Sequence, residues 1–124
     1  MASPTVDRRY GVVGGVAFKA PCACASTGNL TLSGAQTVGT VAATTQRVLV
    51  KSQTDATENG IYVADSSDWE RALDFNSNYD IVNGSLVYVT AGTSATKGIW
   101  AASVTDPLTI GTDDIEFVSV LQTT

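Results

Sequence analysis

The chain has 124 residues, of which 44% are hydrophobic and 15% charged, and this length and composition are typical of one folded domain. Seven Lys and Arg against twelve Asp and Glu give a net charge of −5, so the chain repels phosphate backbones and nucleic acid is not an expected partner. Histidine is absent, which excludes Ser-His-Asp and Cys-His catalysis.

Residues 1–28 are predicted to form an extended N-terminal arm on a β-rich body of residues 29–124. The arm has four glycines, two prolines and no regular apolar period. Three basic and one acidic residue give it a charge of +2, whereas four basic and eleven acidic residues give the body −7, so the two attract each other. We expect the arm to follow the surface of its own body or to lie on a neighbouring copy or another protein. The partner-binding residues expected in the arm are Arg8, Arg9, Tyr10, Phe18 and Lys19.

Two cysteines, Cys22 and Cys24, stand one residue apart near the end of this arm. This spacing strains a mutual disulfide and supplies too few ligands for a zinc site, so we expect two small buried thiols and no metal. The N-terminus lacks the apolar core of a signal peptide, and no stretch is long enough for a membrane-spanning helix. Neither a membrane partner nor a cofactor is therefore expected.

From residue 29 onward, short runs of β-branched and aromatic residues alternate with clusters of Gly, Asn, Asp and Ser. This pattern predicts an all-β fold, a single small β-sandwich or barrel. The predicted strands are residues 30–32, 37–41, 47–51, 60–64, 69–73, 85–90, 99–103 and 115–121.

Two of these strands differ in their side-chain pattern. In residues 47–51, Val48 and Val50 alternate with Arg47, Leu49 and Lys51, which predicts one core face and one face partly in water. Residues 85–90 have sizeable apolar side chains on both faces. We expect this second strand to be the most buried, either central in its sheet or covered by an adjacent subunit.

The connection between residues 73 and 85 is long for a hairpin and is expected to include a short helical turn. Its spacing of Asp74, Asn76, Asn78 and Asp80 resembles a calcium loop, but Tyr79 stands where that loop needs Gly. A loop whose polar side chains bond its own turns is the preferred interpretation.

Possible ligand contacts are Trp69, Arg71 and Tyr79. We expect Trp69 and Arg71 to share one face of a strand, where a structural role is favoured over ligand binding. Seven of the twelve acids fall between residues 55 and 80, but no cleft motif accompanies them, and the chain is not expected to be an enzyme.

The segment RVLVKSQTDATENGIYV at residues 47–63, followed by WERA at 69–72 and by Asp74, resembles a module that recurs in bacteriophage and prophage tail-fibre proteins. The resemblance extends to Leu-Ser-Gly at 32–34 and to a G-x-x-V-x-V strand at 84–89. It covers about residues 29–117 and not the arm. Acidic turn residues usual in that family are missing before residue 47, which predicts a reshaped opening hairpin.

This resemblance implies a structural component of a bacteriophage virion, in the tail or tail-fibre apparatus, that acts in assembly and attachment. It supplies no catalytic residues. The implied partners are other virion proteins and further copies of the chain, as a trimer by fibre analogy, and the implied location is the virion after synthesis in the host cytoplasm. One alternative is a capsid decoration (cement) protein. Another is a carbohydrate-binding module that recognises a host surface glycan through exposed Trp69, Tyr79 or Trp100.

Overall fold

The computed structural model of the chain describes residues 18–78, 80–105 and 107–120 and has an all-β fold of three small sheets, as the sequence predicts. Two short 3-10 helices, Ala56–Glu58 and Leu73–Phe75, accompany the strands. None of the helices in the described part of the chain is long and apolar enough to cross a membrane. The strands are β1 Cys24–Ala25, β2 Gln36–Val38, β3 Val41–Ala43, β4 Arg47–Val50, β5 Gly60–Val63, β6 Glu70–Arg71, β7 Leu86–Val89, β8 Gly98–Ser103 and β9 Glu116–Ser119.

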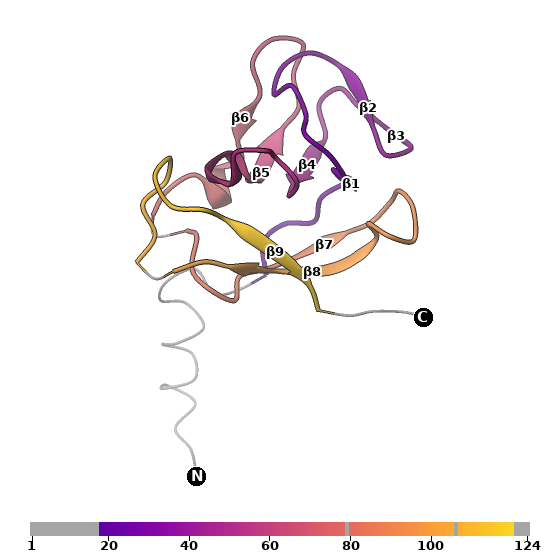
Figure 1. The fold of residues 1–124 in the computed structure, drawn as a ribbon. Coiled ribbons are helices and arrows are strands. Elements are labelled where there is room, and N and C mark those ends of the chain that lie inside the picture. Colours follow the sequence, from indigo (N-terminus) through magenta and orange to yellow (C-terminus); the bar gives the residue numbers. More distant parts are fainter. Residues whose placement is uncertain (1–17, 79, 106, 121–124) are drawn as a thin grey trace.

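The strands form three layers. A four-stranded sheet of order β1-β4-β5-β6 lies above a three-stranded sheet of order β7-β8-β9, and the β2-β3 hairpin lies on the far side of the four-stranded sheet (Figure 1). One buried cluster, which includes Leu49, Ile61, Val87 and Val89, fills the space between the two larger sheets. A second cluster, which includes Val48 and Val50, fills the space beneath the hairpin. The four-stranded sheet is therefore covered on both faces.

Strand β4 is buried on both faces, which corrects the expectation that one face is partly in water. Val48 and Val50 face the second cluster, whereas Leu49 faces the first, and all three are fully buried. At its two sides β4 pairs in parallel with β1 and antiparallel with β5. The polar ends Arg47 and Lys51, which suggested a wet face, lie only at the margins of this buried run.

Residues 18–28, which precede the predicted body in the sequence, lie along it and pair with two of its strands. Phe18 and Cys22 form bridges with Leu86 and Val89 of β7, and the amide of Cys22 donates to the carbonyl of Tyr88. The chain then crosses to the other sheet, where β1 pairs with β4. This segment covers the otherwise free edges of β7 and β4, because unpaired edge groups need backbone partners.

Two further strand predictions are wrong and others differ in length. The strand predicted at 37–41 is instead a hairpin, because the chain turns at residues 39–40, where Gly39 has a positive φ. Residues 30–32 form no strand, although Leu30 and Leu32 pack against the second cluster. The strand predicted at 69–73 is reduced to β6, because the chain turns into a 3-10 helix at Leu73. That helix confirms the short helical turn expected in the connection to β7.

Candidate interaction surface

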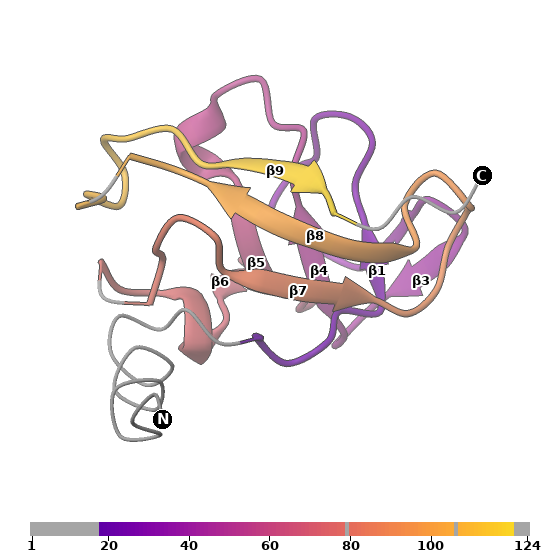
Figure 2. The same cartoon turned by 90° about the horizontal axis from the view of Figure 1, so that it is seen from below.

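The outer face of the β7-β8-β9 sheet is the most apolar exposed surface that the described residues form. Figure 2 looks onto this sheet, with the four-stranded sheet behind it. The pairing of Tyr88 with Ile99 and of Ala101 with Val118 places these side chains on one face. We call this surface the open face; its apolar residues are Phe18, Leu86, Tyr88, Ile99, Ala101, Val118 and Val120, and the paired Ser103 and Glu116 lie at one end of the same face.

Exposure on the open face is high for apolar side chains. Phe18 is 55% exposed, Tyr88 45%, Val118 53% and Val120 52%. On the opposite face of the same strands Val87, Val89 and Ala102 are buried in the first cluster. The sheet thus has one face in its own core and one largely apolar face toward solvent, and exposed apolar patches are candidate interaction surfaces.

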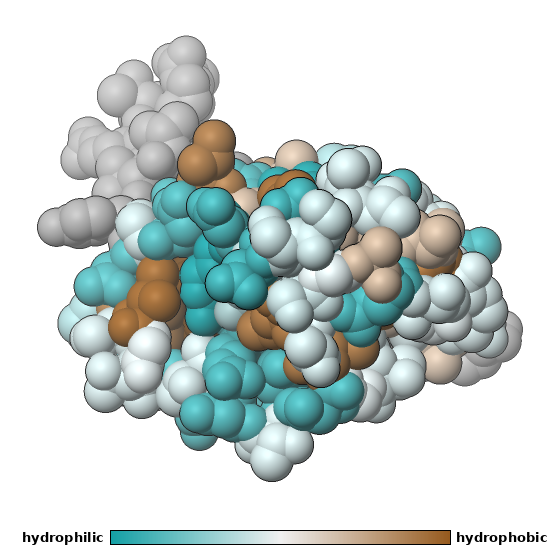
Figure 3. Space-filling model, turned by 90° about the horizontal axis from the view of Figure 1, so that it is seen from above, coloured by the Kyte–Doolittle hydropathy of each residue, from teal (hydrophilic) through white to brown (hydrophobic). Residues whose placement is uncertain are grey.

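The opposite side of the molecule has a different character. Seen from above, on the side of the hairpin, the surface is mainly hydrophilic or neutral, and its hydrophobic areas are small and separated (Figure 3). Scattered apolar side chains of this kind are normal on a soluble domain and need no partner. The contrast singles out the open face as the candidate functional surface.

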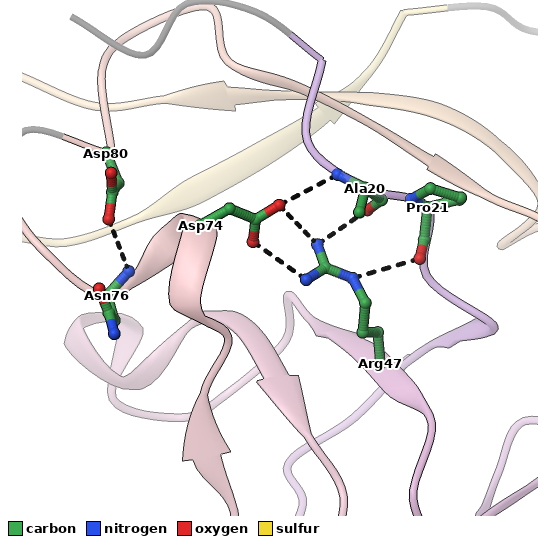
Figure 4. Close-up of polar contacts among 6 residues, drawn as sticks. All are labelled: Ala20, Pro21, Arg47, Asp74, Asn76 and Asp80. Atoms are coloured by element: carbon green, nitrogen blue, oxygen red, sulfur yellow. Dashed lines mark hydrogen bonds and ion pairs between the residues drawn. The ribbon is translucent and has the colours of Figure 1, made fainter.

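A charge cluster around Arg47 fixes the segment that brings Phe18 to the open face (Figure 4). The guanidinium of Arg47 contacts both carboxylate oxygens of Asp74, with Nη1 at 3.0 Å from Oδ1 and Nη2 at 3.2 Å from Oδ2. It also donates to the carbonyls of Ala20, at 2.8 Å, and Pro21, at 3.2 Å. Asp74 in turn accepts the amide of Ala20 at 3.0 Å. Residues 20–21 are thereby joined to β4 and to the 3-10 helix.

The contacts of this charge cluster also lower the pKa of the Asp74 carboxyl group. Burial alone would raise the pKa of Asp74, but the hydrogen bonds from Arg47 and Ala20 and the charges of Arg47 and Lys19 outweigh it. The pKa of Asp74 is therefore held below its usual value, and Asp74 is ionised at neutral pH. A paired carboxylate of this kind adds to stability only while it stays ionised.

Cys22 and Cys24 are both buried, which confirms the prediction from the sequence. Cys22 belongs to the first cluster and Cys24 to the second, so their side chains point to opposite cores and both are free thiols. Burial raises the pKa of Cys22 to about 12, against the opposing charge of Arg47, and burial raises the pKa of Cys24 to about 11. Both thiols are thus protonated and unreactive at neutral pH.

The residues predicted for partner binding in the arm divide into two groups. Arg8, Arg9 and Tyr10 lie outside the described residues. Phe18 lies on the open face, and the ammonium group of Lys19 lies 6.0 Å from the centre of the Phe75 ring. The structure therefore brings one of the five onto the candidate surface.

The residues predicted as ligand contacts have internal roles where they are described. Trp69 is only 5% exposed, and its indole N–H donates to the carbonyls of Gly34 and Asp65. Arg71 donates to the carbonyls of Asn59 and Thr57, and its guanidinium lies over the Tyr62 ring at 5.1 Å. These contacts agree with the favoured structural role.

Two other aromatic residues bear on a ligand platform. Tyr79 lies outside the described residues. Trp100 is half-buried: its indole N–H donates to the carbonyl of Thr96, and the ammonium group of Lys51 lies over its ring at 4.6 Å. Neither Trp69 nor Trp100 offers an open aromatic surface to a sugar.

A groove of about 370 Å³ opens beside β5 and β6, on another part of the surface. Its acids are Asp65, Asp68 and Glu70, and its most exposed apolar side chain is Leu73, at 88%. Asp65 accepts a hydrogen bond from the Ser67 hydroxyl, which lowers its pKa. All three acids are exposed to solvent.

The calcium-like spacing does not bring its oxygens together. Asp74 points to Arg47, whereas Asp80 accepts the amide of Asn76 at 3.3 Å (Figure 4). The amide oxygen of Asn78 accepts the amide of Ile110. Within the described residues, no group of three or more His, Cys, Asp or Glu is placed to hold a metal ion.

Sequence reasoning missed two features of this part of the molecule. It did not single out Asn59, whose buried side chain accepts the Gln53 amide at 2.9 Å and donates to the Ile115 carbonyl at 2.8 Å, which joins the β4–β5 connection to the residue before β9. It also did not single out Val118 and Val120. The available signal for these two was their alternation with Ser119, typical of a strand with one apolar face.

Comparison with known proteins adds no relative, because no family model, no curated protein and no solved structure matches the chain. The open face is thus identified from its own geometry and composition.

Proposed function

We propose that the chain is a structural component of a bacteriophage virion, in the tail or tail-fibre apparatus, and that it acts by assembly with other virion proteins and not by catalysis. The observation that supports this most directly is the open face, on which four side chains that are about half exposed are all apolar. An assembly subunit can bury such a surface against a neighbour.

The construction of the body also supports a building-block role. Two buried clusters share the four-stranded sheet, so the body is a firmly packed unit that can transmit force between neighbours. Among the described residues, every buried side-chain nitrogen and oxygen has a hydrogen-bond partner. The resemblance of residues 29–117 to a tail-fibre module supports the proposal that this unit belongs to a virion.

A carbohydrate-binding function is not part of the proposal. The observation expected to favour it was an exposed aromatic platform, and Trp69 is buried while Trp100 is half-buried beneath Lys51. The exposed aromatic residues of the open face, Phe18 and Tyr88, lie among aliphatic side chains. Paired neighbours such as Leu86 and Ile99 suit another protein surface better than a hydroxyl-rich sugar.

The proposal is tested by quantitative mass spectrometry of phage particles purified from cells whose genome encodes the chain. We expect the chain in the particles at a handful to a few dozen copies, measured against the major capsid protein. Hundreds of copies would place it on the capsid as a decoration protein and overturn the tail location. Absence from purified particles, with the chain present in the lysate, would overturn the virion role itself.

A further inference from the structure

The open face lies at both ends of the described chain. Phe18 is on the face and directly follows residues 1–17, and Val120 is on the face and directly precedes residues 121–124. No described segment covers the face. Residues 1–17 therefore join the described chain at the open face.

The area of the face argues against simple stacking of two copies through this face alone. Its four most exposed side chains present on the order of 400 Å² of apolar surface. A stable interface buries about 800 Å² on each partner. A further apolar element is needed to complete such an interface.

Residues 1–17 have the composition that this face requires. Tyr10, Val12 and Val16 alternate in step with Phe18, so a strand-like conformation would present them together. Arg8 and Arg9 precede them, and the body of residues 29–124 has a charge of −7, from four basic and eleven acidic residues. The segment thus has an apolar part for the face and a basic part for the acidic body.

The register at Phe18 favours a segment from another copy. Phe18 and Cys22 pair in parallel with Leu86 and Val89, so from Phe18 onward the described chain runs along the edge of β7 in the direction of that strand. A segment that precedes Phe18 could cover the face of its own copy only by reversing this direction. A neighbouring copy can supply the segment without such a reversal.

We infer that residues 6–17 of a second copy of this chain dock on the open face, with Tyr10, Val12 and Val16 against Tyr88 and Val118. The inference rests on the proposed assembly role and names the partner in it. When each copy gives its segment and receives another, the contact is reciprocal and closes into a symmetric assembly.

The test uses two preparations of the full chain. The first has the photo-crosslinking residue p-benzoylphenylalanine in place of Val12, and the second is unsubstituted and labelled with nitrogen-15. They are unfolded together in urea with a tenfold excess of the labelled chain, refolded and irradiated, and the cross-linked peptides are identified by mass spectrometry. The isotope label reports whether the two joined peptides come from one chain or from two.

The expected product joins an unlabelled peptide with residue 12 to a labelled peptide that includes Tyr88 or Val118. Cross-links only between two unlabelled peptides would mean that the segment covers its own body, and cross-links to other surfaces would mean that the open face is not its site. Either result overturns this inference. The virion role is tested separately by the content of purified particles.

A pair of matched variants gives an independent measure. Val118→Lys places a charge on the open face, whereas Val63→Lys places the same charge at a partly exposed valine of β5. By light scattering over a concentration series, we expect the first to raise the dissociation constant of the assembly at least tenfold and the second to leave it within twofold. Equal behaviour of the two variants, or a wild-type chain that is monomeric at high concentration, would overturn the inference.

Discussion

Strands β4 and β7 both have apolar side chains on their two faces, but the surroundings of these faces differ. Arg47–Val50 and Leu86–Val89 are both apolar on the two faces of the strand. The described residues cover β4 on both faces, whereas they cover only the Val87 and Val89 face of β7 and leave Tyr88 exposed. A strand with apolar side chains on both faces is therefore not always buried on both by the residues around it, and under the proposed function a partner covers the second face of β7.

The difference in burial between β4 and the open face is tested most directly by truncating one side chain in each of the two larger sheets. Leu49→Ala creates a cavity in the first cluster, where Leu49 is fully buried, and we expect the free energy of unfolding to fall by about 2 to 5 kcal/mol. Val118→Ala on the open face should cost less than about 0.5 kcal/mol in the unassembled chain. Urea denaturation of both variants measures the difference, and similar costs would show that the open face is packed within one chain.

The contribution of the Asn59 hydrogen bonds to the link between the sheets is tested by Asn59→Ala. Removal of this buried amide leaves the Gln53 amide and the Ile115 carbonyl without their partner, and we expect a loss of about 1 to 3 kcal/mol. Asn29→Ala is the matched control, because Asn29 is exposed and accepts one hydrogen bond, from the Thr54 amide. Equal losses in urea denaturation would contradict the role of Asn59 as a joint between the sheets.

The Arg47 cluster should contribute a smaller and pH-dependent amount. Because the folded pKa of Asp74 is lowered, its contribution is present above its ordinary pKa and is lost as the pH falls through the folded pKa. We expect Arg47→Met to cost about 1 kcal/mol at pH 7 and to flatten the fall in stability between about pH 5 and pH 3. A variant whose stability falls with acid as steeply as that of the wild type would contradict this origin; Lys97→Met in an exposed turn is the charge control.

The smallest effect concerns the thiols, where no change in stability is involved. Since burial raises the pKa values of Cys22 and Cys24 to about 12 and about 11, neither should react with a thiol reagent in the folded chain at pH 8. Two equivalents should react once urea unfolds the chain. Rapid labelling of the folded chain would show that the segment from Phe18 to Ala25 opens from the body.

The sequence was sufficient for the β-rich class and for most strand positions, since alternation and turn residues are local signals. It was not sufficient for the environment of each strand. Arg47 and Lys51 suggested a wet face on β4, because one sequence does not reveal that the β2-β3 hairpin folds over it. For β7 the pattern predicted the most buried strand, which is wrong: β4 is more buried, and among the described residues no segment covers Tyr88.

The arm illustrates the same limit. Composition separated residues 1–28 from the rest, but the hydrogen bonds of Ala20 and Cys22 with residues far along the chain were not visible in it. Arg47 was expected on a wet face, and no local pattern indicated its ion pair with Asp74, which is 27 residues away. Long-range pairing of this kind depends on the topology of the fold.

The central claim, that the open face is the assembly surface of a virion protein, is tested most directly by competition during particle production. Cells that encode the wild-type chain express an equal amount of Val118→Lys or of the Val63→Lys control, and the ratio of variant to wild type in purified particles is measured by mass spectrometry. We predict that Val118→Lys is depleted at least tenfold in particles while Val63→Lys enters at its cellular ratio. Incorporation of both variants at their cellular ratios would contradict the claim.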